Sequence, residues 1–182
     1  MTDLRFVRMT APTLAGMKTG SLFRCCFDSK QEFLRELREK NHVLSPKGMR
    51  LIPLNRGEHS ALLYLYRPSR LTSDLANQTA RQVLRQYGYP DGNLAQVLSY
   101  LKRRIISEES FPHEIGLFLS YPPEDVCGFM EGKTPVCTGC WQVYGNAEKA
   151  QKQFQKYHRC TEIYEKQIKK GKTIGQLAVA AR

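Results

Sequence analysis

Two cysteines in a Cys-x-x-Cys arrangement are the residues of this sequence that point most directly to chemistry. Cys137 and Cys140 have the spacing that thiols take in metal knuckles and in redox dithiols. Cys160 is a better candidate third ligand than His158, because the two point in different directions on a helix and Cys160 flanks the apolar seam. Cys127 is a candidate fourth, and zinc or iron is the candidate metal. The alternative is that these cysteines are buried and inert, because free cysteine is among the most buried residue types.

His113 and Glu114 form a second group of residues that could do chemistry. An imidazole beside a carboxylate can exchange protons with a substrate or ligate a metal, so we interpret the two as a candidate catalytic pair. Two further acids, Glu124 and Asp125, follow a few residues later. The alternative is that these acids stabilise the N-terminus of a helix and that His113 is a loop residue.

The segment Pro12–Gly20 brings hydroxyls, an amine and two glycines close together in the chain. Thr13, Lys18 and Thr19, with the backbone amides of such a loop, are candidate ligand-binding residues for a phosphate or carboxylate. The pattern is not a Walker loop, and neither a dinucleotide-binding G-x-G-x-x-G pattern nor a G-x-S-x-G nucleophile elbow occurs. The alternative is a tight structural turn.

The basic charge of the chain is concentrated near its C-terminus. The sequence has 182 residues and a formal net charge of +11, and residues 146–182 contain nine basic and three acidic residues, a net charge of +6. Because a regular apolar seam runs through that segment, we interpret the charge as the solvent face of an amphipathic helix. Tyr64 and Tyr66 could stack on single-stranded RNA, but apolar residues on both faces of their strand favour a core position. Nucleic acid is therefore a disfavoured partner.

The composition is typical of a cytoplasmic globular protein. No apolar run approaches the roughly 18–20 residues of a membrane helix, and the N-terminus lacks the apolar segment of a secretory signal. Six cysteines in a chain of this length suit a reducing compartment. We expect a single domain over residues 1–182, with 146–182 as a C-terminal helical segment. Its seam can pack on the protein's own sheet or on a second copy, so the oligomeric state stays open.

The first half of the chain is predicted to form a helix and a hairpin. The helix begins after Ser29, where Glu32 completes a capping box, and ends near Asn41. The hairpin joins strands at Met49–Leu54 and His59–Tyr66, and the second strand has the pattern of a central strand. Residues 11–20 are interpreted as a structured loop with a short helical turn.

The second half is mostly helical. Helices are predicted at 72–87 and from residue 93, followed by a strand at Glu114–Tyr121 and a short helix that ends near Gly132. A strand at 141–144 and a long helix between Asn146 and Gly171 complete the chain. The fold class is therefore α+β, a mainly antiparallel sheet of about four strands with helices packed on it.

Three segments of the sequence resemble one uncharacterised bacterial family. They are APTLAGMK at 11–18, HEIGLFLSYPPEDVCGF at 113–129 and CTGCWQVYG at 137–145. The family is classified only as a domain of unknown function, and the resemblance covers nearly the whole chain. Members are common in anaerobic bacteria, where their genes lie near those for flavodoxin and ferrous-iron transport. The resemblance implies an accessory role in iron or redox metabolism.

These observations lead to three hypotheses. In the first, a cytoplasmic protein binds a small ligand or metal through the Cys137–Cys140 region and has an accessory role in iron or redox metabolism. In the second, an enzyme holds a small anionic substrate in the Pro12–Gly20 loop and moves protons with His113 or Glu114. In the third, the chain is a nucleic-acid-binding module. The residues alone do not specify a reaction.

Overall fold

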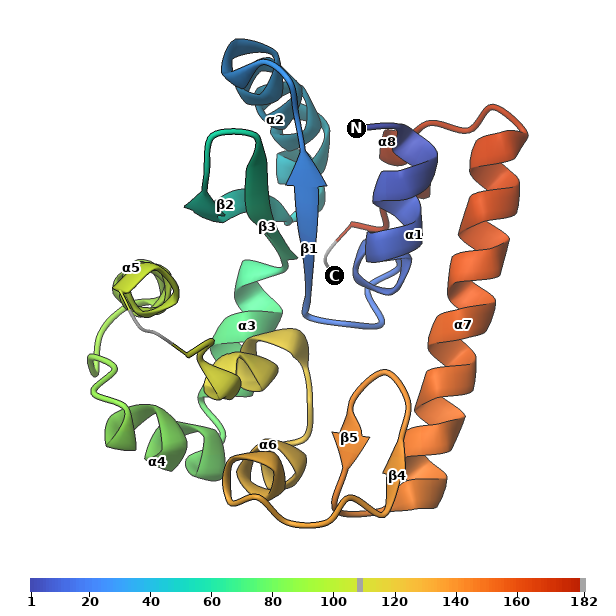
Figure 1. Ribbon diagram of the computed structural model, residues 1–182. Coiled ribbons are helices and arrows are strands. Elements are labelled where there is room, and N and C mark those ends of the chain that lie inside the picture. Colours follow the sequence, from blue (N-terminus) through green and yellow to red (C-terminus); the bar gives the residue numbers. More distant parts are fainter. Residues whose placement is uncertain (108–109, 181–182) are drawn as a thin grey trace. The chain divides into compact units, whose positions relative to one another are not determined.

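The computed structural model describes residues 1–107 and 110–180, which gather into two compact units (Figure 1). The first unit combines residues 1–69 with the described residues from Tyr157 onward, and the second is Arg70–Lys156. Two helices belong to both units, α3 (Pro68–Leu75) and α7 (Ala147–Lys169). The chain therefore leaves the first unit through α3 and returns to it through α7.

A three-stranded antiparallel sheet forms the centre of the first unit. Its order is β1 (Gly20–Cys26), β3 (Ser60–Tyr66) and β2 (Arg50–Arg56). The predicted hairpin and the central position of its second strand are confirmed. β3 is buried on both faces, with Leu63 and Leu65 on one and Tyr64 and Tyr66 on the other. The two tyrosine rings stack on each other with centroids 5.0 Å apart, so they are interior residues.

Three helices, together with part of α7, share a core with one face of this sheet. They are α1 (Asp3–Leu14), α2 (Lys30–Leu44) and α8 (Ile174–Leu177). Ser29 caps α2 as its spacing predicts, by accepting a hydrogen bond from the N–H of Glu32. The helix continues past its predicted end to Leu44 and is followed by the 3-10 turn η1 (Ser45–Lys47). Asn41 covers part of the edge of β2, because its side chain accepts from the N–H of Leu51 and donates to that residue's carbonyl.

The short helical turn predicted within residues 11–20 is the last turn of a longer helix. α1 runs through Pro12 to Leu14, and the segment then leads into β1, a strand that periodicity does not predict. A proline in the last turn removes only one intrahelical hydrogen bond, and the fully buried apolar face of α1 outweighs that loss. The buried Arg67 guanidinium donates to the carbonyls of Thr13 (2.8 Å) and Leu14 (2.9 Å), where a helix C-terminus favours a cation.

The second unit contains short helices and one small hairpin. Its elements are α4 (Gln78–Gln86), α5 (Leu94–Ser107), η2 (His113–Leu119), α6 (Pro123–Met130), β4 (Cys137–Thr138) and β5 (Gln142–Val143). The single helix predicted over 72–87 is two helices, because Asn77 accepts from the N–H groups of Thr79 and Ala80 and starts α4. The helix expected from residue 93 and the short helix after Pro122 are confirmed as α5 and α6. The strand predicted at 141–144 is the two-residue β5, paired with β4.

The strand predicted at Glu114–Tyr121 is wrong, since most of this segment forms the 3-10 helix η2. Every residue from Glu114 to Leu119 is buried. An apolar run that is buried on all sides has no period that distinguishes a strand from a helix. Pro112 and Pro122 flank the segment, and proline cannot donate to a strand ladder.

The long helix α7 has the seam that the sequence predicts. Its members are buried or half-buried: Ala147, Ala150, Phe154, Tyr157, Thr161, Tyr164 and Ile168. In the second unit Phe154 packs edge to face on Trp141, with ring centroids 4.5 Å apart. In the first unit Tyr164 and Ile168 pack against the core. The seam therefore packs on the protein itself, and the lysines of α7 are exposed.

The fold class is α+β, as predicted, with a three-stranded antiparallel sheet, a two-stranded sheet and a long C-terminal helix. Among the residues described, no helix combines the length and hydropathy that crossing a membrane requires.

Candidate functional site

A pocket of about 240 Å³ lies in the second unit where η2, α6 and the β4–β5 hairpin meet. The residues that line it are His113, Ile115, Gly116, Tyr121, Asp125, Val126, Phe129, Trp141 and Gln142. Two of the segments that carry the family resemblance, 113–129 and 137–145, therefore contribute to one cavity. We call this cavity the aromatic pocket.

Two pairs of rings form much of its wall. Tyr121 and Trp141 stack with centroids 5.1 Å apart and planes at 26°. His113 and Phe129 meet edge to face at 4.9 Å and 70°. Both arrangements are among those that aromatic pairs prefer. Trp141 is 9% exposed and Phe129 is 40% exposed, so the pocket combines a buried wall with an accessible rim.

Asp125 is the buried charge of the aromatic pocket and holds its parts together. Its Oδ2 accepts from the indole Nε1–H of Trp141 at 2.7 Å, and its Oδ1 accepts from the backbone N–H groups of Tyr144 (2.7 Å) and Gly145 (2.9 Å). Hydrogen bonds to a carboxylate are roughly twice as strong as neutral ones. The carboxylate thus joins α6 to the hairpin, and both of its oxygens are engaged.

A glycine makes this close approach of the hairpin to α6 possible. A Cβ atom on Gly128 would lie 2.5 Å from Cγ of Tyr144 and 2.7 Å from its Cβ. Atoms cannot approach that closely, so a larger residue would displace Tyr144 and with it a donor to Asp125.

The structure separates the two residues of the predicted catalytic pair. His113 is exposed and lies at the rim of the aromatic pocket. Glu114 is 1% exposed and does not line the pocket; it forms an ion pair with Arg104 at 2.7 Å and accepts from the Tyr89 hydroxyl at 2.9 Å. Burial and the charge of Glu114 raise the pKa of Tyr89 far above its usual range, so the phenol stays a donor. A proton-transfer role for the pair remains a prediction.

Cys137 and Cys140 both lie in the β4–β5 hairpin. Cys137 is half-buried in β4, and Cys140 is exposed in the loop. The hydroxyl of Tyr121 donates to the carbonyl of Cys140 at 3.3 Å, which links the loop to the wall of the aromatic pocket. Gly139, between the cysteines, lies so close to the ring of Phe154 that a Cβ atom there would overlap it.

The other two candidate thiols have different surroundings. Cys127 is half-buried on α6, and Cys160 is buried in the core of the first unit. Burial raises the pKa of both thiols, that of Cys160 to about 11. Over residues 1–107 and 110–180, no three His, Cys, Asp or Glu side chains are placed to hold one metal ion. The predicted metal or redox role therefore rests on the Cys137–Cys140 pair.

The predicted anion-binding residues lie in the first unit, where they form hydrogen bonds in and around the turn after α1. Thr13 is fully buried, and its hydroxyl oxygen lies 2.8 Å from that of Ser21. Thr19 is 2% exposed, and its carbonyl accepts from the N–H of Arg67 at 2.9 Å. Lys18 is half-buried, and its N–H donates to the carbonyl of Pro12 at 3.1 Å. Anion binding by these residues remains a prediction.

Comparison with known proteins gives the family. The sequence matches the model of a family described as a protein of unknown function, DUF3793, over residues 6–178. The chain belongs to this family. The match extends over both units, and it confirms the expected membership of an uncharacterised family. No curated protein and no solved structure matches the sequence.

Sequence reasoning missed most of the lining of the aromatic pocket. Tyr121, Phe129 and Trp141 are not among the predicted site residues, and for Asp125 the sequence leaves open a role beside His113 or at the start of a helix. The available signal was local: these aromatic residues and this acid lie in the same two segments as His113 and the Cys-x-x-Cys motif. Several aromatic residues beside an acid in such segments favour a binding site.

Proposed function

We propose that this protein binds a small molecule with a planar, largely apolar ring in the aromatic pocket. The observation that carries the proposal is the convergence of residues 113–129 and 137–145 on one cavity of about 240 Å³. A cavity of that size, below the usual range for drug-sized ligands, suits one or two fused rings. The stacked Tyr121–Trp141 pair offers a rigid aromatic wall, and Phe129 offers an accessible ring at the rim.

The polar groups of the aromatic pocket support binding more than catalysis. Both oxygens of Asp125 already accept hydrogen bonds, so this carboxylate is poorly placed to take a proton from a substrate. Its charge still favours a ligand with an N–H group or a partial positive charge in the ring. His113 and Gln142 are exposed at the rim, where they can hydrogen bond to a ring substituent.

The chain supplies its own reporter for this proposal. Trp141 is the only tryptophan, so its indole N–H gives a single signal in a two-dimensional ¹⁵N–¹H spectrum. A panel of one- and two-ring heteroaromatic fragments is titrated while this signal is followed. We expect several fragments to shift it in a saturable way, with dissociation constants on the order of millimolar, as fragments of this size allow.

Phe129→Ala and Phe111→Ala form a matched pair for the same titration. Both phenylalanines lie in the second unit and are similarly exposed, at 40% and 45%, but only Phe129 lines the aromatic pocket. Phe129→Ala should weaken fragment binding about tenfold, in line with the loss of one aromatic contact, and Phe111→Ala should leave it unchanged. An indole signal that no fragment shifts, or equal effects of the two variants, would refute the proposal.

A second candidate function is thiol redox chemistry or metal binding at Cys137 and Cys140. It is favoured by their common hairpin and by the exposure of Cys140, which contrasts with the buried thiol of Cys160. It would suit a protein of the reducing cytoplasm with an accessory role in iron or redox metabolism. Metal analysis of protein purified without oxygen tests it, with the Cys137→Ser/Cys140→Ser variant as control. Zinc or iron that is absent from both preparations, together with thiols inert to mild oxidant, would exclude it.

A further inference from the structure

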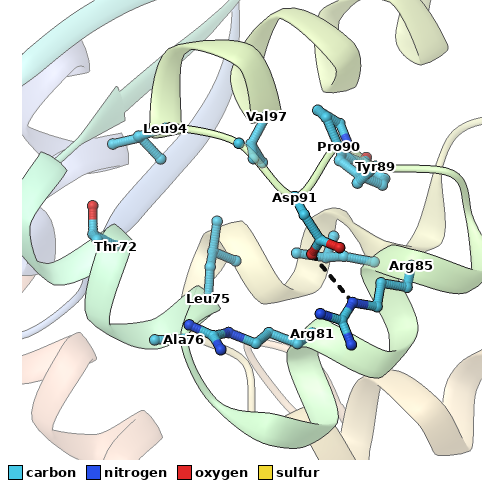
Figure 2. A pocket seen from close by; sticks show the side chains of 12 residues that line it. Thr72, Leu75, Ala76, Arg81, Arg85, Tyr89, Pro90, Asp91, Leu94 and Val97 are labelled. Carbon is cyan, nitrogen blue, oxygen red and sulfur yellow. Dashed lines mark hydrogen bonds and ion pairs between the residues drawn. The ribbon is translucent and has the colours of Figure 1, made fainter.

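A second, larger cavity lies in the same unit and shares no lining residue with the aromatic pocket. Its volume is about 480 Å³, within the range of small-molecule sites. The end of α3, one face of α4, the turn after α4 and the start of α5 surround it, and Figure 2 shows the side chains that point toward it. We call it the arginine pocket.

The floor of the arginine pocket is apolar. Leu75, Leu84, Tyr89 and Val97 line it and are between 5% and 9% exposed. These side chains belong to the packed interior and present only a part of their surface to the cavity. A ligand would therefore bury an apolar body against a preformed surface, without first opening the fold.

Two arginines of α4 stand on one side of this floor, across from Leu94 and Val97 of α5 (Figure 2). Arg81 and Arg85 are four residues apart, so they share one face of the helix. The single acid of the lining, Asp91, forms an ion pair with Arg85 at 3.1 Å. Arg81 has no ion-pair partner among the residues that the structure describes. The lining therefore carries an uncompensated positive charge.

The placement of Arg81 has no evident benefit for the fold. Like charges four residues apart on a helix destabilise it slightly, and a cation near the beginning of a helix is unfavourable with respect to the helix dipole. Arg81 lies close to the start of α4 and four residues before Arg85. An anion between the two guanidinium groups would remove both unfavourable interactions at once.

We propose that the arginine pocket binds a small carboxylate with an apolar body. The carboxylate would bind to the guanidinium of Arg81, whose planar donors match carboxylate geometry, and would compete with Asp91 for Arg85. Asp91 is exposed in the turn before α5, so breaking its ion pair with Arg85 costs little stability. The apolar body would lie on Leu75, Leu84 and Val97. Inorganic phosphate has no apolar surface to bury against these side chains, so it would bind more weakly.

Three probes separate the parts of this proposal: benzoate, its neutral isostere benzamide, and inorganic phosphate. Each is titrated into the ¹⁵N-labelled protein, and backbone signals of residues 81–97 are followed. We expect benzoate to shift these signals with a dissociation constant at least tenfold below those of benzamide and phosphate. Benzamide as good as benzoate would refute the role of charge, and phosphate as good as benzoate would refute the role of the apolar floor.

Three exposed-site variants then test the residues themselves. Arg81→Gln should weaken benzoate binding about tenfold, the loss expected for a charge-assisted hydrogen bond at an accessible site. Arg103→Gln removes the same charge from α5 outside the lining and should leave binding unchanged. Asp91→Asn should strengthen binding several-fold, because Arg85 loses its competing partner. Equal losses in Arg81→Gln and Arg103→Gln, or weaker binding in Asp91→Asn, would overturn the proposal.

Discussion

The turn after α1 in the first unit and the aromatic pocket in the second both contain buried polar groups, but they differ in what surrounds those groups. In the turn, Thr13, Thr19 and Arg67 are all almost fully buried. The Arg67 guanidinium donates to the carbonyl of Thr13, and the Arg67 backbone N–H donates to the carbonyl of Thr19. In the aromatic pocket, Asp125 is equally buried, but His113 and Phe129 remain exposed around it. Satisfied polar groups indicate structure in both places, and in the aromatic pocket they also lie beside a cavity with exposed side chains at its rim.

The largest effect is expected from removing the carboxylate that holds the aromatic pocket. Asp125→Ala leaves three N–H donors without their acceptor. Each buried donor without a partner costs about 1–3 kcal/mol, and partial access to water reduces this cost. The free energy of unfolding should therefore fall by about 4 kcal/mol. Urea unfolding followed by Trp141 fluorescence measures this loss, because the indole is one of the three donors.

Glu124→Ala is the matched control for this substitution. Glu124 is the neighbouring acid of α6 and is exposed. Its removal should change the unfolding free energy by less than about 0.5 kcal/mol, as is usual for surface positions. If the free energy of unfolding falls by a similar amount in both variants, Asp125 does not hold the hairpin against α6, and its buried hydrogen bonds do not stabilise the aromatic pocket.

Where a pattern depends on local chemistry, sequence reasoning succeeded. The Ser29 cap, the hairpin over 49–66 and the seam of α7 follow from spacing and turn residues, and the structure has all three. Reasoning failed where tertiary burial overrides the pattern. The buried run after Glu114 has no useful period, and Pro12 stays helical because the buried face of α1 compensates for the lost hydrogen bond.

The candidate site was predictable only in part, for a physical reason. His113, Cys137 and Cys140 stand out by residue type; the structure places His113 in the lining of the aromatic pocket and links the loop at Cys140 to its wall. That Glu114 is buried against Arg104 and Tyr89 could not be foreseen, because these contacts join separate segments of the chain. The binding wall formed by Tyr121 and Trp141 depends on a contact between segments twenty residues apart, which no local pattern encodes.

A smaller loss is expected at the turn of the first unit. Arg67→Met removes donors to the carbonyls of Thr13, Leu14 and Val179, while the methionine fills part of the space. Stability should fall by about 3 kcal/mol, since carbonyls at the end of α1 lose their charged partner and stay buried. Hydrogen exchange of the β1 and β3 amides reports this loss in the first unit. Arg56→Met, an exposed position on β2, should leave exchange unchanged, and equal protection in both variants would mean that Arg67 does not stabilise the turn.

The smallest effect on folding, but a clear effect on thiol reactivity, is expected for one cysteine in each unit, Cys160 in the first and Cys140 in the second. Cys140 is exposed, whereas Cys160 is 7% exposed and burial raises its pKa to about 11. At pH 8, only about one Cys160 thiol in a thousand is ionised, against roughly a quarter for a thiol in an unfolded chain, so the native protein should alkylate there about a hundredfold more slowly than the urea-unfolded protein. Iodoacetamide labelling with mass spectrometry measures both rates.

The same thiol gives the pH dependence a definite sign. The folded state keeps Cys160 protonated up to about pH 11, while the unfolded chain releases this proton near the ordinary value for a thiol. The stabilisation from keeping this thiol neutral is therefore complete below that ordinary value and is lost as the pH rises toward 11. Cys160→Ala should make this alkaline decline shallower, and Cys140→Ala should leave it unchanged. A native protein in which Cys160 labels as fast as Cys140 at pH 8 would show that the core of the first unit is open to solvent, and the contrast between a closed structural region and an accessible one would not hold.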